Sequence, residues 1–366
     1  MSWAEDLSRI DSEGCRRRLG SLKGAVGADF TTNDSLGLST HPALLESVKA
    51  SFSKMGATGS RLLGGDSPTL RELEAALAQW LSIESALVFN SGYHANTGIL
   101  PALYGPGDVV FADRLCHASL WDGIALSKAS LHRFAHNDLT HLETLLKKHR
   151  PNAKRAVIVA EALFSMDGDF APLSDLVRLK HQFGAELYVD EAHSIGAYGP
   201  TGNGLVGLLG LEKDIDFWVG TFGKAFGSYG AFVGCADILK HLLINKARPF
   251  IFSTALPQPV VAWNLAAIHL MPHLHSERQT LHRHSAQFRD HLPGTPSTSH
   301  IVPVITGSAA SALALADRLH TEGFAVTAIR HPTVPKGTER IRLSLTATHS
   351  PDTLHHLLHI LSETLA

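Results

Sequence analysis

The stretch Glu186-Leu187-Tyr188-Val189-Asp190-Glu191-Ala192-His193 decides the fold of this chain. Its apolar part is typical of a buried strand, and Asp190 stands where that strand ends. About one βαβ unit later, Lys224 lies in the glycine-rich stretch Thr221-Phe222-Gly223-Lys224-Ala225-Phe226-Gly227. Ligands of open α/β sheets bind at the carboxyl ends of the strands, so we expect Asp190 and Lys224 to meet there.

Short apolar runs with helical stretches between them extend this pattern in both directions. Strands are expected at Ala86–Phe89, Val109–Ala112, Leu131–Phe134, Ala156–Ala160, Leu187–Asp190, Phe217–Gly220 and Ala231–Gly234. Helices are expected at Thr69–Leu81, Asn96–Tyr104, Ala118–Lys128, Thr140–His149 and Leu173–Phe183. Most of the runs are apolar on both faces, which predicts an α/β fold with a mostly parallel, doubly wound sheet of seven strands.

The pattern changes after about residue 250, and a chain of 366 residues exceeds a usual single domain. A long helical region is expected from Pro257 to about His291, followed by strands at Ile301–Ile305, Phe324–Ile329 and Ile341–Leu345 and helices at Ala309–Glu322 and Asp352–Leu365. This sequence of elements predicts a smaller α+β C-terminal lobe. We therefore expect an N-terminal arm at residues 1–40, a large domain at 41–255 and a small domain at 256–366.

Composition excludes several classes of protein. The formal net charge of −2 gives no support for a nucleic-acid partner. The three cysteines, Cys15, Cys116 and Cys235, form neither a disulfide framework nor a zinc pattern, which favours the reducing cytoplasm. The N-terminus lacks the order of a signal peptide, and Val260–Met271 is too short to span a membrane. Many of the 23 histidines fall in C-terminal helices (His273, His275, His282 and His284) without metal-binding spacing, so we expect solvated side chains there and no metal site.

Lys224 and Asp190 together fit the chemistry of pyridoxal 5'-phosphate (PLP). A lysine amine can form a Schiff base with the aldehyde of PLP, and a carboxylate can keep its pyridine nitrogen protonated so that the ring withdraws electrons. The flanking Phe222 and Phe226 would remove the amine from water, which favours its neutral, nucleophilic form. Taken singly, a surface lysine and an aspartate that caps a helix would be the ordinary interpretations.

Other residues could complete such a site. Asn90–Asn96 follows a strand and precedes a helix, where backbone N–H groups can bind a phosphate and Gly92 lets the chain come close. Thr221 offers a hydroxyl three residues before the lysine. His193 could donate a hydrogen bond to the phenolic oxygen of PLP. His117 could stack on the pyridine ring, although a capping or core histidine is the commoner interpretation.

The ordered set of motifs resembles the α-oxoamine synthase family of PLP enzymes, from about Asn33 to His349. The matching stretches are Asn33–Leu38, Gly59–Leu62, Phe89–Tyr93, Asp113–Ser119, Phe164–Asp169, Asp190–His193, Thr221–Gly227 and Phe252–Thr254. The resemblance implies the fold type I, aminotransferase-like architecture. It also implies a PLP-dependent acyltransferase that forms a carbon–carbon bond and releases CO2.

The resemblance also implies how PLP would be bound. Lys224 would carry the Schiff base, Asp190 would pair with the pyridinium, and His193 would contact the ring oxygen. His117 would stack on the ring and shape the substrate site, and Ser165 would lie against the cofactor. Phosphate would be bound by Gly92, Tyr93 and Thr221, with Thr254 contributed by the neighbouring subunit of a homodimer.

The substrate residues follow from the same resemblance. Arg330 would hold the amino-acid carboxylate with help from Asn33, and Arg16 and Thr333 would belong to the acyl-substrate region. The stretch Ala328–His349 favours the biotin-pathway member of the family, which condenses L-alanine with a pimeloyl thioester of acyl carrier protein or CoA.

Two positions depart from the family pattern, because Leu70 replaces a usual histidine and His331 replaces a frequent proline.

Three other members of the family share the core motifs and remain alternatives: glycine C-acetyltransferase, 5-aminolevulinate synthase and serine palmitoyltransferase. An inactive PLP-binding protein is a remote alternative. A dinucleotide-binding dehydrogenase would need a glycine fingerprint after the first strand, and none is placed that way.

Overall fold

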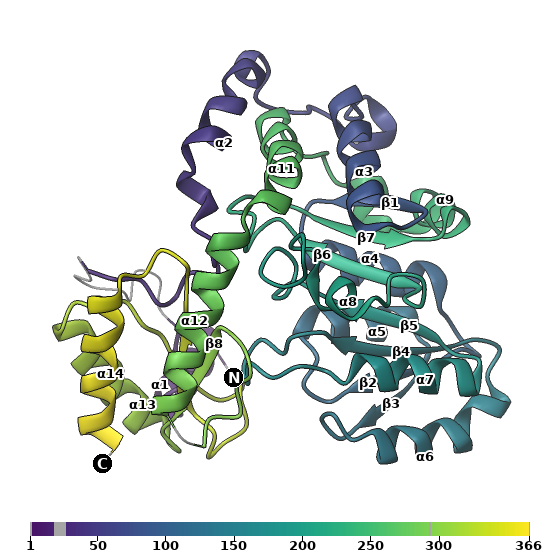
Figure 1. Cartoon of the computed structure of the whole chain (residues 1–366). Helices are drawn as coiled ribbons and strands as arrows, with labels where there is room; N and C mark the ends of the chain where they lie inside the picture. Colours follow the sequence, from purple (N-terminus) through teal and green to yellow (C-terminus); the bar gives the residue numbers. More distant parts are fainter. Residues whose placement is uncertain (1, 18–26, 293, 366) are drawn as a thin grey trace. The chain divides into compact units, whose positions relative to one another are not determined.

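A computed structural model describes residues 2–17, 27–292 and 294–365 of the chain (Figure 1). The chain divides into two compact units. The larger unit comprises Leu36–Phe164 and Phe170–Arg278, and the smaller unit comprises Met1–Ser35, Ser165–Asp169 and Gln279–Ala366. The three-domain division drawn from the sequence stays a prediction.

The larger unit is built on a sheet that has seven strands in the described part of the chain. The strands are β1 (Ser85–Phe89), β2 (Val109–Asp113), β3 (Ser130–Phe134), β4 (Ala156–Glu161), β5 (Glu186–Asp190), β6 (Phe217–Thr221) and β7 (Ala231–Cys235). Their order is β1-β7-β6-β5-β4-β2-β3. β7 is antiparallel to both of its neighbours, and the other neighbouring pairs are parallel. The prediction of a seven-stranded, mostly parallel sheet is confirmed.

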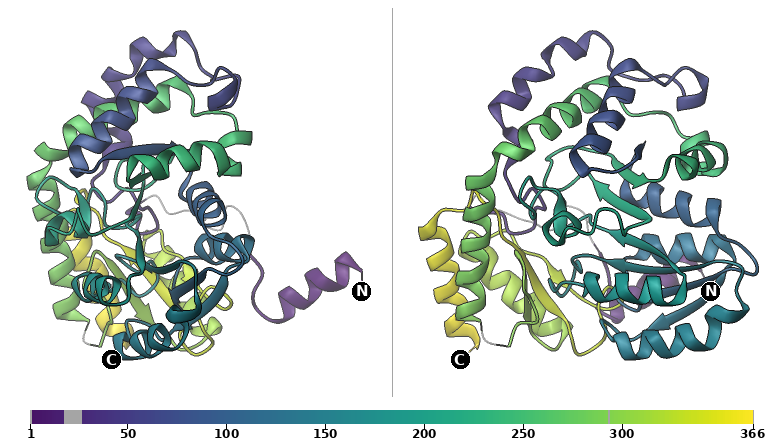
Figure 2. Two further views of the ribbon diagram at one scale, coloured as in Figure 1. Left: turned by 90° about the vertical axis from the view of Figure 1, so that its right-hand side faces the viewer. Right: turned by 45° about the vertical axis from the view of Figure 1, so that its right-hand side comes forward.

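Helices cover both faces of this sheet (Figures 1 and 2). α4 (Gly92–Leu103) and α5 (Ala118–Ser127) pack on each other over one face, together with α9 (Asp237–Lys246) and α10 (Arg248–Phe252). α6 (Leu139–His149) and α7 (Leu173–Phe183) pack on each other over the other face. Burial on two sides explains why the central strands are apolar on both faces between their polar end residues, whereas the edge strand β3 buries only Phe134.

The remaining helices of the larger unit are α2 (Pro42–Ser47), α3 (Pro68–Leu81), α8 (Gly204–Leu209) and α11 (Gln258–Leu270), and α12 (His275–His291) follows them. Short 3₁₀ turns are formed by Leu38–Thr40, Lys49–Ser53, Arg61–Leu63, Arg150–Asn152 and Met271–His273. Ser67 caps α3, and its apolar stripe packs on β1 and α11. Leu70 lies in that stripe and is fully buried, so the departure from the family's histidine fills a core position.

Two predicted helices have different bounds in the structure. The helix expected at Asn96–Tyr104 is α4, which begins four residues earlier because Ser91 caps it by accepting the His94 N–H at 3.2 Å. The long helix expected from Pro257 to His291 is divided into α11 and α12. The 3₁₀ turn Met271–His273 separates them, and its Pro272 cannot continue the backbone hydrogen bonds of α11.

The smaller unit contains an antiparallel sheet of β8 (Ile301–Ile305), β10 (Arg340–Ser344) and β9 (Ala328–Ile329), in that order. α13 (Ala309–Thr321) packs on β9 and β10, and α1 (Trp3–Ser12) and α14 (Pro351–Leu365) complete the described helices of this unit. β9 is shorter than the expected strand Phe324–Ile329. Ala325 instead pairs with the N-terminal arm, because its N–H donates to Ala28 O and its carbonyl accepts the Phe30 N–H, each at 2.9 Å.

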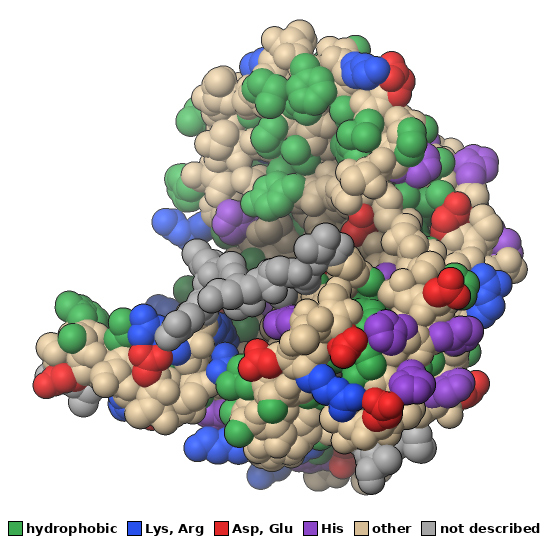
Figure 3. All heavy atoms as spheres, turned by 90° about the vertical axis from the view of Figure 1, so that its left-hand side faces the viewer, with side chains coloured by type: hydrophobic (Ala, Val, Ile, Leu, Met, Phe, Trp, Pro, Cys, Tyr) green, Lys and Arg blue, Asp and Glu red, His purple; other side chains and the backbone are tan. Residues whose placement is uncertain are grey.

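The surface bears on two of the expectations from composition. Figure 3 shows several histidine side chains on the outer surface of one face. His273, His275 and His282 are exposed as expected, but His284 is buried, because its Nδ1 lies 3.0 Å from the Thr346 carbonyl on the inner side of α12. Among the described residues, no group of histidine, cysteine or acidic side chains is arranged to hold a metal ion. No helix in the described ranges has the length and apolar character needed to cross a membrane.

Candidate active site

Asp190 ends β5 at the carboxyl edge of the sheet and is only 6% exposed. Its Oδ2 accepts a hydrogen bond from Asn96 Nδ2 at 2.8 Å, and its Oδ1 accepts the Ala192 N–H at 3.0 Å. Both donors are neutral groups. Burying a carboxylate is costly unless a positive charge accompanies it, so this position suits a protonated ring nitrogen.

Lys224 lies in the loop that follows β6 and is half-buried. The loop is closed by Gly230, whose carbonyl accepts the Thr221 hydroxyl and the Phe222 N–H, each at 2.9 Å. The Gly227 N–H donates to the Lys224 carbonyl at 2.8 Å, and Phe222 and Phe226 are fully buried on either side. The backbone that carries the amine is therefore fixed at the end of the strand next to β5.

The pKa of His117 responds to two other predicted residues, Asp190 and Lys224. Partial removal of the His117 ring from water lowers its pKa, and Lys224 lowers it further. The carboxylates of Asp190 and Asp122 act in the opposite direction and raise it. His117 is thus close enough to both Asp190 and Lys224 for their charges to act on it, although the three residues belong to or follow three different strands.

His117 also caps α5, as the sequence allowed. Its Nδ1 accepts the Ser119 N–H at 3.3 Å and lies 2.8 Å from Ser119 Oγ. A backbone N–H can only donate, so Nδ1 is an acceptor and the proton of the neutral ring is on Nε2. The lowered pKa favours this neutral form.

The start of α4 is suited to an anion. The first N–H groups of a helix have no acceptor within it, and the helix dipole favours negative charge there. These groups belong to Gly92 and Tyr93, and a Cβ built on Gly92 would meet nothing within 4 Å, so the space beside them is open. The Tyr93 hydroxyl donates to the Asp122 carboxylate, and this hydrogen bond raises the pKa of Tyr93. The arrangement fits the phosphate group of PLP.

For other predicted cofactor residues, the structure shows hydrogen bonds with the protein itself or their place in the fold. The Thr221 hydroxyl also accepts the Gly223 N–H at 3.1 Å, so it holds the lysine loop. Thr254 is exposed, and its carbonyl accepts Asn90 Nδ2 at 2.7 Å. His193 is half-buried, three residues beyond β5, and Ser165 belongs to the smaller unit. Their contacts with PLP stay predictions.

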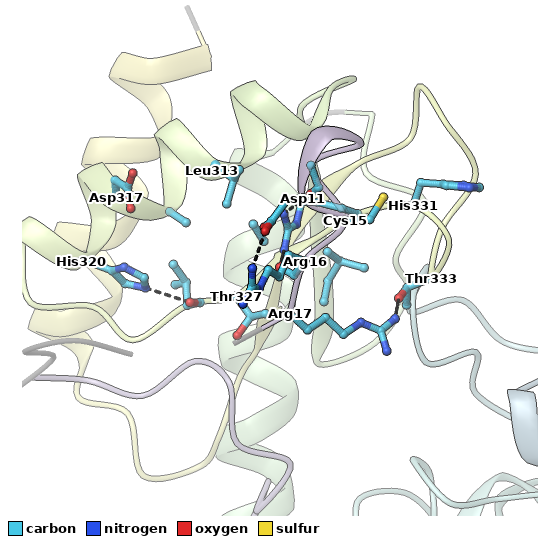
Figure 4. A pocket seen from close by; sticks show the side chains of 16 residues that line it. Asp11, Cys15, Arg16, Arg17, Leu313, Asp317, His320, Thr327, His331 and Thr333 are labelled. Atoms are coloured by element: carbon cyan, nitrogen blue, oxygen red, sulfur yellow. Dashed lines mark hydrogen bonds and ion pairs between the residues drawn. The ribbon is translucent and has the colours of Figure 1, made fainter. Parts of the chain in front are cut away.

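The predicted substrate residues of the smaller unit meet at the N-terminal arm. Arg330 donates to the carbonyls of Gly14 and Arg16, the latter at 3.2 Å. Arg17 donates to the Thr333 hydroxyl at 2.9 Å, and the Arg16 guanidinium pairs with Asp11. These contacts line a pocket of about 560 Å³ between the arm and the strand end at Ile329 (Figure 4).

Arg342 is a candidate that sequence reasoning missed. Its Nε donates to the Ser165 carbonyl at 2.6 Å, and its Nη2 donates to Asn33 Oδ1 at 3.2 Å. Arg342 thus contacts two residues that the sequence assigned to the site. The available signal was its position in the buried strand β10, since a buried arginine usually has a specific partner.

Comparisons with known proteins show the family to which the chain belongs. The family model for aminotransferase class I and II matches residues 26–361. An 8-amino-7-oxononanoate synthase from Geobacter sulfurreducens is 44% identical over 372 residues, which cover 96% of this chain and 95% of that protein. A serine palmitoyltransferase from S. paucimobilis, solved with PLP-myriocin bound, superposes with a TM-score of 0.88 at 33% identity and covers 92% of this chain and 86% of its own. An 8-amino-7-oxononanoate synthase from Francisella tularensis gives a TM-score of 0.79 at 29% identity, covering 92% and 97%.

Proposed function

Because this chain belongs to the aminotransferase class I and II family, and within it to the α-oxoamine synthases, we propose that it condenses L-alanine with a pimeloyl thioester and releases CO2. This is the reaction of the 8-amino-7-oxononanoate synthases of biotin biosynthesis. The observation that carries the proposal is the nearly full-length likeness to proteins of that name. The charges of Asp190 and Lys224, which both act on His117, support it.

The cofactor is PLP, and the larger unit fits it on two independent counts. The buried carboxylate of Asp190 accepts hydrogen bonds from two neutral donors, Asn96 and the Ala192 N–H, and the start of α4 at Gly92 is open to an anion. When bound, PLP supplies a ring that withdraws electrons from the α-carbon of the amino acid. Lys224 would hold it covalently, Asp190 would face its ring nitrogen, and Gly92 and Tyr93 would hold its phosphate. Contacts of Thr221, Thr254, His193 and Ser165 with PLP are part of the same proposal.

The protein's own groups would orient alanine and move its proton. Arg330 and Asn33 are proposed to hold the alanine carboxylate, which would fix how the α-carbon of alanine is oriented in the site. Arg342 joins this set because it already donates to Asn33. The Nζ atom of Lys224, once displaced by the substrate amine, would accept the α-proton of alanine.

The acyl substrate is proposed to bind in the smaller unit. The distal carboxylate of a pimeloyl group calls for a cation, and the pocket shown in Figure 4 carries the guanidinium groups of Arg16 and Arg17 beside Thr333. Its wall also includes the apolar side chains of Leu313 and Ile329, which suit a methylene chain.

The three cysteines are free, in keeping with the expected cytoplasmic location.

A homodimer is supported by a group of exposed apolar residues in the larger unit. Leu63 is 84% and Phe252 70% exposed, and they flank paired segments in which Ser60 bridges Thr254. Apolar side chains this exposed are typical of an interface. We propose that a second copy covers them, and that Thr254 reaches the neighbouring phosphate site.

Product analysis tests the activity directly. The purified protein with PLP would be given alanine, glycine or serine, each with pimeloyl, acetyl, succinyl or palmitoyl thioesters. We expect a product with the mass of 8-amino-7-oxononanoate from alanine and the pimeloyl donor. Serine palmitoyltransferase activity is the second candidate because that structure has the higher TM-score, and a product from serine and palmitoyl-CoA alone would replace our proposal.

A further inference from the structure

A buried polar network lies beside Asp190 in the larger unit. Its other members are Asn96 on α4, Ser119 on α5 and Tyr188 on β5. Asn96 and Ser119 are each 1% exposed, and Tyr188 is fully buried. Polar groups this deeply buried lower the stability of the fold unless they have hydrogen-bond partners, so the loss of any hydrogen bond in the network should be destabilising.

Asn96 is the centre of this network. Its Nδ2 donates to Asp190 Oδ2 at 2.8 Å and to Ser119 Oγ at 2.9 Å. Its Oδ1 accepts the Tyr188 hydroxyl at 2.6 Å. Both hydrogens of the amide and one lone pair of its oxygen are therefore used by side chains.

These contacts fix the orientation of the Asn96 amide. If the amide were flipped, Oδ1 would face the Asp190 carboxylate, which can only accept, and two oxygens would meet without a proton between them. Burial and the charge of Asp190 raise the pKa of Tyr188 well above its ordinary value, so its hydroxyl keeps the proton that it donates to Oδ1. The amide hydrogens are thus directed at Asp190 and Ser119.

The network continues from Ser119 to His117. Ser119 Oγ accepts from Asn96, so its own hydrogen is available for His117 Nδ1 at 2.8 Å. The Ser119 N–H also donates to that nitrogen. The hydrogen bonds therefore run in one direction: Tyr188 donates to Asn96, Asn96 donates to Ser119, and Ser119 donates to His117. Asn96 also donates to Asp190.

We propose that Asn96 is a positioning residue of the PLP site. It aims the Asp190 carboxylate at the ring nitrogen and, through Ser119, holds His117 in its Nε2–H tautomer. The inference rests on the proposed cofactor but not on the identity of the substrates. Asn96 is neutral, so Asp190 is the one member of this network that would present a negative charge to the protonated ring nitrogen of PLP.

Cofactor binding by the full chain tests the proposal without any turnover. The Asn96→Ala protein would be freed of PLP and titrated with it, and the absorption of bound PLP would be followed against pH. We expect PLP to bind about tenfold to a hundredfold more weakly, the usual effect of losing a hydrogen bond to a charged group. We also expect a rise in the pH at which the absorption band changes, which is where the nitrogen that joins PLP to Lys224 loses its proton. A pyridine ring that is protonated less firmly withdraws less electron density from that nitrogen, so the nitrogen keeps its proton to a higher pH.

Tyr104→Phe is the matched control. Tyr104 is also a buried polar residue of the larger unit, and its hydroxyl donates at 2.7 Å to Glu186 Oε2, at the opposite end of β5 from Asp190. Both variants should lower the melting temperature of the PLP-free protein, but only Asn96→Ala should move the pH midpoint. An Asn96→Ala protein with wild-type PLP affinity and an unmoved midpoint would show that the network serves packing alone and would overturn the proposal.

Tyr188→Phe keeps the test decisive if Asn96→Ala does not fold. This change keeps the ring and removes only the donor to Asn96 Oδ1, so the amide loses one of its fixed contacts. We expect the same shifts at about a threefold loss of PLP affinity. Wild-type protein that binds no PLP at all would refute the cofactor, and with it this inference. Wild-type protein that binds PLP but makes no product from alanine would refute only the proposed substrates.

Discussion

Tyr188 and Asp190 lie on the same face of β5, and their side chains share one partner, Asn96 of α4. Residues two apart in a strand point to the same side of the sheet, and α4 packs over the side that carries Tyr188. The carboxylate at the strand end is therefore anchored by the helix whose first turn is open to a phosphate. One α4–β5 contact thus links the two ends of the proposed cofactor site.

Replacing Lys224 removes the amine on which the proposed chemistry depends. Lys224→Ala should abolish the absorption band of covalently bound PLP and reduce turnover by at least about a thousandfold, since an amine that moves a proton contributes that much. Absorption spectra and product formation would be measured beside Lys148→Ala, an exposed lysine on α6. A Lys224→Ala protein that keeps both the band and turnover would contradict the assignment.

Arg342 should govern the affinity for the amino acid. Lysine cannot reproduce the fork of donors by which Arg342 reaches both Ser165 and Asn33. Arg342→Lys should therefore raise the KM for alanine about tenfold or more and change the KM for the acyl thioester little. Steady-state kinetics would be compared with Arg318→Lys, a surface arginine paired with Glu363. Equal KM values for alanine in wild type and Arg342→Lys would remove Arg342 from the substrate site.

The proposed dimer predicts a response to charge on the exposed apolar residues. Phe252→Glu should weaken self-association, because burying a carboxylate in an interface costs far more than burying a phenyl ring. The mass in solution would be measured by light scattering across a range of protein concentrations, with Leu208→Glu on α8 as the exposed control. If Phe252→Glu has the same mass as wild type at every concentration, this surface is not the interface.

Two histidines of the smaller unit that are held neutral should each contribute a loss of stability as the pH is lowered below about 6.5. Burial is the main cause that lowers the pKa of His284 and of His349 below the ordinary value of 6.5. His349 accepts the Thr346 N–H at Nδ1 and donates from Nε2 to Asp29 O at 3.0 Å, so the neutral ring is fully bonded.

The direction of this pH effect on stability follows from the number of protons that the folded and unfolded chains bind. Below pH 6.5 the unfolded chain binds protons that the folded chain does not, so the free energy of unfolding rises with pH, by at most about 1.4 kcal/mol per pH unit for each group. Urea unfolding at several pH values from 5 to 8 would measure this slope. His349→Gln should reduce the slope, whereas the exposed His359→Gln should not. A slope that is unchanged by His349→Gln would show that this histidine is not the cause.

Much of the larger unit could be predicted from the sequence because its signals are local. The strand β5 and its terminal Asp190 are encoded by one apolar run followed by an acidic residue, and each of the seven predicted strands lies within a residue of its observed bounds. The loop of Lys224 is likewise marked by its own glycines and phenylalanines. Local signals of this kind require no knowledge of which elements are neighbours.

The parts that could not be predicted depend on partners far away in the chain. Nothing near Phe324 shows that Ala325 pairs with Ala28 and Phe30, so β9 was expected to be longer. Asn96 was expected to begin a helix, and only the packing of α4 on β5 gives its amide Asp190 and Tyr188 as partners. The sequence by itself determined the strands and marked the side chains proposed to carry the chemistry, and the tertiary structure decided which residues contact them. The physical reason is that a hydrogen bond needs its donor and acceptor within about 3 Å, and for residues about 90 positions apart only the fold brings them together.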